Sequence, residues 1–213
     1  MKTYTFDSKL RLGTTIPSFT DDQIKNEPMF FSCDRNYVES NGGPISKSFL
    51  AALESGWENC IIDSRVHMLM PGWWPAIAGN HHDDVPRSKS NGQPNYDNPE
   101  YYSEHAMALV GGDVCPTEFS LGKAEFEEVV TGKVYGVWHN KVNEYVKSGV
   151  LKTVSAPTNT MLYFDWQTWH QGTKAVKNGW RWFMRASRNT QRPIKNEIRR
   201  QVQVYLEKPM EGW

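Results

Sequence analysis

Apolar and β-branched residues recur along the chain in short runs, separated by turn residues about every ten positions. The clearest run is residues 60–70, CIIDSRVHMLM, which predicts a strand that the following Pro-Gly pair ends. Residues 180–187, WRWFMRAS, predict a second strand. Further strands are expected at 150–155, at 160–166, at 199–206 and, as a pair around Gly111 and Gly112, within 105–121.

Two segments have the spacing of a helix instead. Residues 46–56 carry apolar residues at positions 49, 50 and 53, and residues 138–149 carry them at positions 142, 145 and 146. Such positions lie on one face of a helix. Gly56 and Gly149 are the expected stops.

The remaining segments read as loops. Residues 1–45 are expected to form an N-terminal extension of loops and short strands, and residues 86–104 a long loop. A long loop without periodicity is more often functional than idle. Because strands outnumber helices, the pattern favours a mainly β fold with a few helices, a β-sandwich or jelly roll. We predict one domain over residues 1–213, with its core in 60–190.

Composition limits the partners and the cellular compartment that we expect for this protein. The 213 residues carry 24 basic and 24 acidic side chains, so the formal net charge is zero. Nucleic acid is therefore not the expected partner, since gripping it needs a basic surface. The three cysteines are widely spaced and odd in number, which favours a reduced compartment. Without an apolar leader or a membrane-length apolar run, we expect a cytoplasmic protein with no membrane partner.

The stretch GNHHDDVPR, residues 79–87, places two histidines directly before two aspartates. On an extended strand, residues two apart point to the same face. Either His81 with Asp83 or His82 with Asp84 would then offer an imidazole nitrogen and a carboxylate oxygen to one metal ion. A shift by one residue would turn every side chain over, so both pairs cannot serve together.

A third ligand must come from elsewhere, and His170 is the candidate. It follows the predicted strand 160–166 and precedes a glycine. Two histidines and one carboxylate on one face of an octahedron hold non-haem Fe(II) and leave three positions open.

Two arginines follow in the strand 180–187. Alternation places Arg181, Phe183 and Arg185 on one face, with tryptophans and a methionine on the other. The apolar face is the one that normally packs, so the arginines face an interior or solvent. A buried arginine needs a partner, and its guanidinium fork matches a carboxylate. An interior position would therefore indicate an anionic ligand, such as a dicarboxylate.

Taken together, His81-x-Asp83, the distal His170 and Arg181 eleven residues later resemble the Fe(II)/2-oxoglutarate-dependent oxygenases. The resemblance spans about residues 60–190 and is strongest in TWHQGTKAVKNGWRWFMR. It implies a double-stranded β-helix, the cupin-like form of the jelly roll. It also implies that His81, Asp83 and His170 form the metal-binding and catalytic triad. The glycine before the segment fits the pair His81/Asp83 better than His82/Asp84.

The resemblance further implies the cosubstrates. Iron takes the keto-acid end of 2-oxoglutarate, Arg181 the far carboxylate, and O₂ completes the site, so that succinate and CO₂ are released. We add Arg185 and Thr117 as candidate cosubstrate-binding residues. Since Asp83 is present, hydroxylation or demethylation is expected rather than halogenation. The prime substrate, a small molecule or a side chain of a macromolecule, stays unspecified.

Two rival functions use the same residues differently. One is a non-catalytic cupin-like module that binds a metal or ligand. The other is a zinc hydrolase that uses His81, His82 and His170. Asp165 is either a partner that orients His170 or a surface residue at the strand end. We also expect the loop 86–104 to cover the site and its tyrosines, Tyr96, Tyr101 and Tyr102, to contact the substrate.

Overall fold

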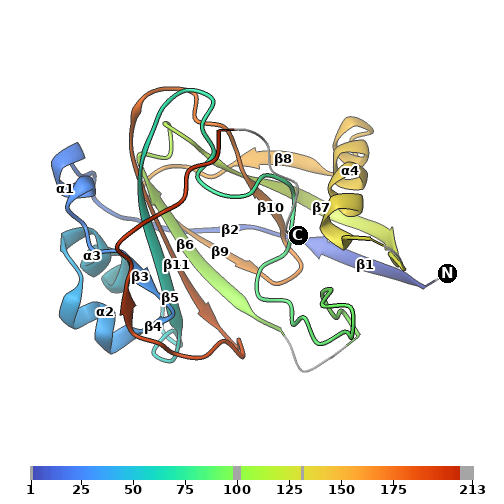
Figure 1. Cartoon of the computed structure of the whole chain (residues 1–213), viewed down its shortest axis with the longest axis horizontal. Helices are drawn as coiled ribbons and strands as arrows, with labels where there is room; N and C mark the ends of the chain where they lie inside the picture. The colour runs from blue at the N-terminus through green and yellow to red at the C-terminus, as the bar shows by residue number, and fades with distance from the viewer. Residues whose placement is uncertain (1, 98–101, 131, 207–213) are drawn as a thin grey trace.

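The computed structural model describes residues 2–97, 102–130 and 132–206 (Figure 1). These residues form more strand than helix, which confirms the prediction of a mainly β fold. The strands are β1 (Thr3–Ser8), β2 (Arg11–Thr15), β3 (Phe30–Phe31), β4 (Cys33–Asp34), β5 (Ile61–Leu69), β6 (Glu104–Val110), β7 (Thr117–Glu127), β8 (Lys152–Ser155), β9 (Thr160–Asp165), β10 (Trp169–Gly172), β11 (Gly179–Arg188) and β12 (Glu197–Ile198). The helices are α1 (Asp21–Lys25), α2 (Arg35–Asn41), α3 (Pro44–Ala52) and α4 (Val134–Lys147).

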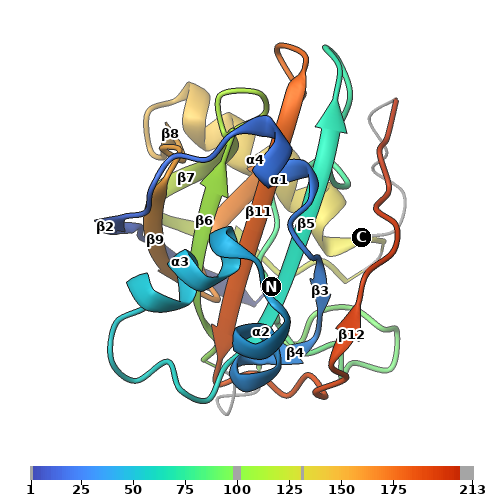
Figure 2. The same cartoon turned by 90° about the vertical axis from the view of Figure 1, so that its left-hand side faces the viewer.

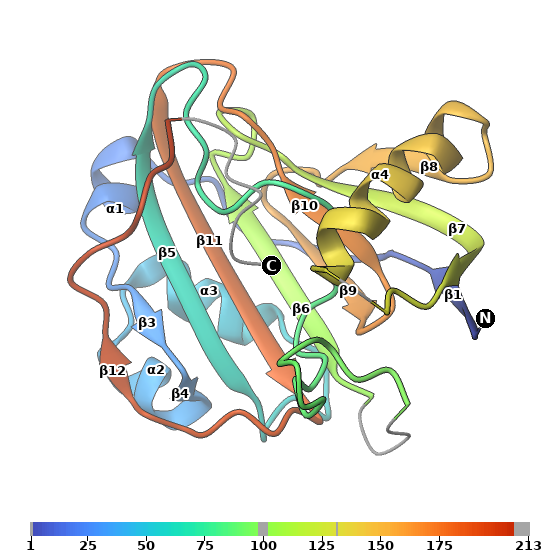
Figure 3. The same ribbon diagram turned by 45° about the vertical axis from the view of Figure 1, so that its right-hand side comes forward.

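The strands form two main antiparallel sheets that lie against each other (Figure 3). The larger sheet has the order β2-β9-β6-β11-β5-β4, and in the smaller sheet β7 pairs with β1, β8 and β10. Apolar side chains of β6, β7 and β9 meet between the sheets, among them Leu109, Phe119 and Phe164. The site described below lies in this space between the sheets.

Helices cover the outer faces of both sheets. Helices α1, α2 and α3 lie over the larger sheet (Figure 2), where Ile24, Val38 and Phe49 pack against its apolar side chains. Helix α4 covers the smaller sheet through Trp138 and Val142. No helix in the described part of the chain is long and apolar enough to cross a membrane.

Strand β11 alternates as predicted. Trp182 and Met184 are buried in the core beneath α1–α3. Phe183 packs with the cluster between the sheets, so Arg181 and Arg185, which share its face, point into the same space. Neighbouring β5 alternates in the same way and places Asp63, Arg65 and His67 opposite Arg185, Phe183 and Arg181 in the register.

Most of the expected elements form. The strands predicted at 60–70, 150–155, 160–166 and 180–187 are β5, β8, β9 and β11. The helices predicted at 46–56 and 138–149 are α3 and α4, each of which begins a few residues earlier than expected. The predicted loop 86–104 contains no helix or strand at 86–97 or 102–103. One of its three tyrosines, Tyr101, lies outside the described residues.

Three expectations were wrong. Residues 1–45 are no extension, because β1 and β2 are full members of the two sheets. The two strands around Gly111 do not pair with each other, since β6 belongs to the larger sheet and β7 to the smaller. Residues 199–206 form no strand, because their backbone makes only isolated contacts. Tyr205 forms a single bridge with Trp74, and the Arg199 N–H donates to the Met29 carbonyl.

Candidate metal centre

A short backbone bridge brings two histidines together between the sheets. The backbone N–H of His81 donates to the carbonyl of His170 at 3.0 Å, and the N–H of His170 donates to the carbonyl of His81 at 3.3 Å. His170 lies in β10, whereas His81 lies in the connection between β5 and β6. The bridge sets the two ring centroids 4.5 Å apart.

Both rings are oriented in the same way. The Nδ1 atom of His81 lies 2.9 Å from the carbonyl oxygen of Gly79, and that of His170 lies 3.0 Å from the carbonyl oxygen of Thr168. A carbonyl oxygen only accepts a hydrogen bond, so Nδ1 carries the hydrogen in each ring. The Nε2 atom of each ring then carries the lone pair that a metal would bind, as in metal-bound histidines whose other nitrogen donates to the backbone.

Asp83 completes the cluster. Its Oδ2 lies 3.0 Å from Nε2 of His170, and its Oδ1 lies 3.7 Å from Nε2 of His81. One ligand atom from each of the three residues lies within 4.8 Å of the others. Two ligand atoms about 2.1 Å from an ion and at right angles lie roughly 3 Å apart, so the donor set fits a small divalent ion.

The protonation states suit a metal. Burial, helped by the neighbouring His170, lowers the pKa of His81 to about 4, so its ring is neutral at pH 7. Burial alone would raise the pKa of Asp83, but the Arg185 guanidinium and His170 hold that pKa well below its usual value. A neutral imidazole and an ionised carboxylate are the forms that bind a metal ion.

The second pair of the motif points elsewhere. The His82 ring lies against Trp169, with centroids 3.7 Å apart, and its Nδ1 lies 2.9 Å from the Tyr96 hydroxyl. Asp84 instead accepts a hydrogen bond from Arg192 at 3.1 Å. The structure therefore assembles the pair His81/Asp83, and the three-histidine set of a zinc hydrolase does not form.

The reason for this register differs from our prediction. Residues 81–84 form no strand, and only His81 makes a bridge. The backbone turns after Asp83, since Asp84 has a φ of 54°. Consecutive residues still separate: His81 and His170 face the space between the sheets, while His82 and Trp169 lie in the aromatic cluster under α4.

Asp165 acts on His170 less directly than predicted. It accepts hydrogen bonds from the Thr168 hydroxyl at 2.9 Å and from the Gln167 backbone at 3.2 Å. These bonds fix the turn before β10. The carbonyl of Thr168, rather than the carboxylate, then holds the His170 ring.

Arg181 is buried beside Thr117. Its Nε donates to the Cys115 carbonyl at 2.7 Å, and its Nη2 donates to the Thr117 hydroxyl at 3.1 Å. No carboxylate among the described residues lies within ion-pair distance of this guanidinium. Burial lowers the pKa of Arg181 from its usual value. Arg181, which we predicted for the distal carboxylate, and Thr117, which we predicted for the cosubstrate, are thus neighbours. The Arg181 charge has no carboxylate partner among the described residues.

Arg185 has a different environment. It forms an ion pair with Asp83 and lies 3.9 Å from Asp63 and 3.7 Å from Asp84. These carboxylates outweigh the effect of burial and raise its pKa. Its charge is already matched by carboxylates of the chain. The prediction that it binds a cosubstrate stays untested, and the visible contact is the one with the candidate ligand Asp83.

Sequence reasoning missed Asp63, the acidic partner of Arg185 and Arg192. Asp63 lies opposite Arg185 on β5 and also accepts a hydrogen bond from Arg192 at 2.5 Å. Its pKa is lowered, because Arg185 and Arg192 outweigh its burial. The signal was available in the strand 60–70, where Asp63, Arg65 and His67 alternate with apolar or small residues.

A cavity of about 570 Å³ opens beside Asp83. Its walls come from residues 82–88, from residues 190–193 and from Tyr135 of α4. Residues 86–88 belong to the loop 86–104 that we expected to cover the site, so that loop borders the cavity beside the candidate ligand Asp83. Another of its residues, Tyr96, hydrogen-bonds Tyr135 at 2.9 Å and anchors the loop to α4.

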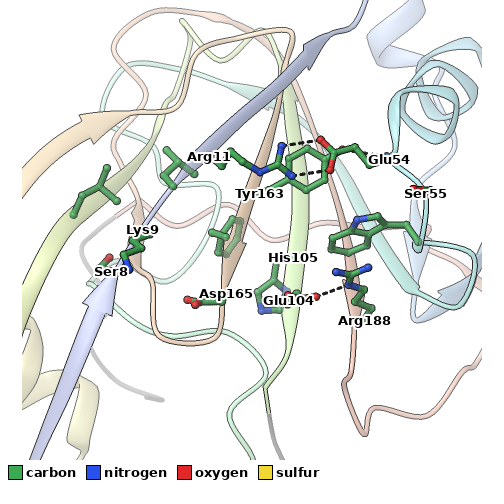
Figure 4. A pocket seen from close by; sticks show the side chains of 14 residues that line it. Ser8, Lys9, Arg11, Glu54, Ser55, Glu104, His105, Tyr163, Asp165 and Arg188 are labelled. Atoms are coloured by element: carbon green, nitrogen blue, oxygen red, sulfur yellow. Dashed lines mark hydrogen bonds and ion pairs between the residues drawn. The ribbon is translucent and has the colours of Figure 1, made fainter.

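A second cavity, of about 600 Å³, lies at the other side of β9 and contains none of the triad (Figure 4). Both of its arginines are paired. Arg11 donates two hydrogen bonds to Glu54, each 2.7 Å long, and Arg188 donates to Glu104 at 2.5 Å. This cavity therefore offers no arginine without a carboxylate partner to a ligand.

Comparisons with known proteins give no family for this chain, so the assignment of a function rests on the chemistry of the site. The chain matches no protein-family model, no curated protein and no solved structure.

Proposed function

We propose that this protein is an Fe(II)- and 2-oxoglutarate-dependent oxygenase. The observation that carries the proposal is the buried Arg181, whose charge no described carboxylate matches, in the same interior as a two-histidine, one-carboxylate cluster. A buried guanidinium without a counter-ion is costly, so such a site is built for an anion that arrives from solution. A dicarboxylate that also chelates the metal meets both requirements.

The fold supports the proposal. We infer that the two facing antiparallel sheets are a double-stranded β-helix, with His170 on an inner face and the segment of His81 and Asp83 bridged to it. His170 lies on β10 of the smaller sheet, whereas Arg181 and Arg185 lie on β11 of the larger one. A ligand in the space between the sheets would therefore contact both.

Each residue has a role in the proposed reaction. His81 and His170 hold iron through Nε2, and Asp83 holds it through a carboxylate oxygen. Arg181 and Thr117 bind the distal carboxylate of 2-oxoglutarate and so orient the keto acid toward the metal. Arg185 keeps Asp83 ionised and fixes its direction.

When bound, iron and 2-oxoglutarate supply O₂ activation: one oxygen atom enters succinate as CO₂ leaves, and the other enters a C–H bond of the substrate. The product is a hydroxylated compound. On a methyl group attached to nitrogen or oxygen, the same step leads to demethylation. The chain binds and orients the substrate and the cosubstrate, and the two sheets around the site exclude bulk water.

The test is an anaerobic titration of the metal-free protein with Fe(II) and then with 2-oxoglutarate. The proposal predicts a visible metal-to-ligand charge-transfer band that appears only when both are present. His170→Ala should lose the band and weaken Fe(II) binding by more than the roughly 10–100-fold that loss of an outer partner costs. No band in the wild-type protein would overturn the proposal.

A matched control separates the rival functions. His82→Phe removes the neighbouring imidazole but keeps an aromatic ring against Trp169, so it should retain the band. If His82→Phe lost metal as completely as His170→Ala, the three-histidine zinc site would be favoured instead. A protein that showed the band but released no succinate with O₂ would be a binding module.

A further inference from the structure

Arginines from two segments line the cavity beside Asp83. Arg87 reaches it from the loop after the metal-binding segment, and Arg192 reaches it from the segment after β11. Asp83 itself lines the cavity, so a molecule bound there lies next to the candidate metal.

These two arginines have donors to spare. Arg87 has no carboxylate within ion-pair distance among the described residues, and its hydrogen bond at 3.3 Å goes to the carbonyl of Gly92. Arg192 binds Asp63 and Asp84 through Nη1 and Nε, but its Nη2 is buried without a hydrogen-bond partner in the described part of the chain. Unused guanidinium donors at a cavity wall favour an oxyanion as the ligand.

The charge of the whole site points the same way. The described residues place more arginines than aspartates around the triad and its cavity. The arginines are Arg65, Arg87, Arg181, Arg185, Arg192 and Arg199, and the aspartates are Asp63, Asp83 and Asp84. The proposed iron and 2-oxoglutarate carry two positive and two negative charges, so they leave this excess unchanged. The remaining positive charge favours an anionic ligand.

We propose that the cavity beside Asp83 is the prime-substrate site and that the substrate carries a phosphate or carboxylate group, which Arg87 and Arg192 hold. This inference rests on the proposed oxygenase function and names its substrate class. The two guanidinium groups bind the anionic group at the cavity wall. The rest of the substrate then extends toward Asp83, where the C–H bond to be oxidised must lie.

The Arg11 and Arg188 cavity is the internal comparison. There each arginine already has a glutamate partner, so a cavity of similar volume offers no unmatched cation. An oxyanion should therefore discriminate between the two cavities, and should prefer the one beside the triad.

The test uses the full chain loaded with Mn(II) and saturated with 2-oxoglutarate, which occupies open metal positions. Inorganic phosphate is observed by ³¹P NMR and, in a separate arm, ¹³C-labelled acetate by ¹³C NMR. Paramagnetic broadening by Mn(II) reports an anion bound near the triad. We expect saturable broadening of at least one probe, and the stronger arm identifies the anionic group of the substrate.

Arg87→Gln is the decisive variant, because Arg87 lies on a loop and makes no ion pair that the fold needs. It should lower the affinity for the anion whose signal is broadened by about tenfold, the loss expected for a charge-assisted contact. Arg200→Gln removes the same charge from an exposed residue and should change the affinity less than twofold.

The outcomes separate the two proposals. The substrate inference is wrong if Mn(II) and 2-oxoglutarate bind but neither anion signal is broadened in a saturable way. It is also wrong if the Arg87→Gln variant broadens the anion signal as the wild type does. In both cases the oxygenase proposal stands. If 2-oxoglutarate does not bind the Mn(II) protein, both are wrong.

Discussion

Arg181 combines two properties that a folded chain rarely places on one side chain, a permanent charge and almost complete burial. The exposed fraction of the residue is 4%. Two acceptors, the Cys115 carbonyl and the Thr117 hydroxyl, fix the guanidinium without neutralising it. Its geometry is thus set before any ligand arrives, which reduces the side-chain entropy that the protein loses on binding.

Arg181→Met tests this role. In the wild-type protein, 2-oxoglutarate at a hundred times its Kd should raise the free energy of unfolding of the metal-loaded form by about 2.7 kcal/mol. In the variant, loss of a buried charged contact costs about 2–5 kcal/mol, so the affinity should fall at least about 30-fold. Thermal unfolding with and without 2-oxoglutarate measures both. An equal rise in Tm for the variant would remove Arg181 from the cosubstrate site.

For single residues, the sequence predicted which way a side chain points better than which residue it contacts. Alternation on a strand was enough to place Arg181 and Arg185 on one face, opposite the tryptophans, but it left open whether that face meets an interior or solvent. The contact between Arg185 and Asp83 joins positions 102 residues apart, and no local pattern encodes it. His81 and Asp83 lie together beside His170 although the segment is not a strand, since a turn can also bring residues two apart together. Their role as metal ligands stays a prediction.

Among the elements, the turn between β6 and β7 is sterically constrained at Gly111. The chain passes there from the larger to the smaller sheet, so the turn sets where Thr117 meets Arg181. Gly111 has a φ of 70°, and a Cβ at this position would lie 2.2 Å from the carbonyl oxygen of Trp180. The glycine is required both by its backbone conformation and by the approach of β11.

Gly111→Ala should therefore be severely destabilising. A left-handed conformation costs an alanine about 1–2 kcal/mol, and the clash with β11 backbone adds about 1–3 kcal/mol. Gly92 offers a matched control, because it has the same φ of 70° but nothing within 4 Å of its Cβ position. Gly92→Ala should lose only the first amount. Urea unfolding of the two variants measures the difference, and equal losses would contradict the steric argument.

The elements that we missed carried signals of another kind. Helix α1 begins with a capping box, in which Thr20 and Gln23 satisfy each other's backbone N–H groups. Helix α2 begins at the capping residue Asp34. Both helices are too short for apolar periodicity, so only their caps could have revealed them. The strand expected at 199–206 had the pattern of a strand, but the fold provides it with only one bridge.

Across the whole molecule, the outer faces of the sheets are apolar and one end of their interior is polar. Burial lowers the pKa of His67 and of His105 to about 3. The folded state keeps both rings neutral, whereas the unfolded chain takes up protons near pH 6.5. Because the unfolded state binds more protons between these values, stability is full above pH 6.5 and falls as the pH decreases.

The metal-free protein should consequently lose stability well before its carboxylates titrate. Each of these two histidines lowers the free energy of unfolding by about 1.4 kcal/mol per pH unit below pH 6.5. Denaturant unfolding at pH 7.5 and at pH 5, in the presence of a chelator, gives the slope. His67→Gln should reduce the slope by about 1.4 kcal/mol per unit, and an unchanged slope would exclude His67 as a source.

The bridge between His81 and His170 has a further consequence for the chain as a polymer. An ion held by both residues would close a loop of roughly ninety residues, comparable in reach to a long-range disulfide. Its main effect on the unfolded ensemble would be to reduce chain entropy. Iron would then act as a reversible cross-link between β10 and the segment that leads into the substrate cavity. The supply of the metal would govern how long this part of the chain survives attack by proteases, independently of turnover.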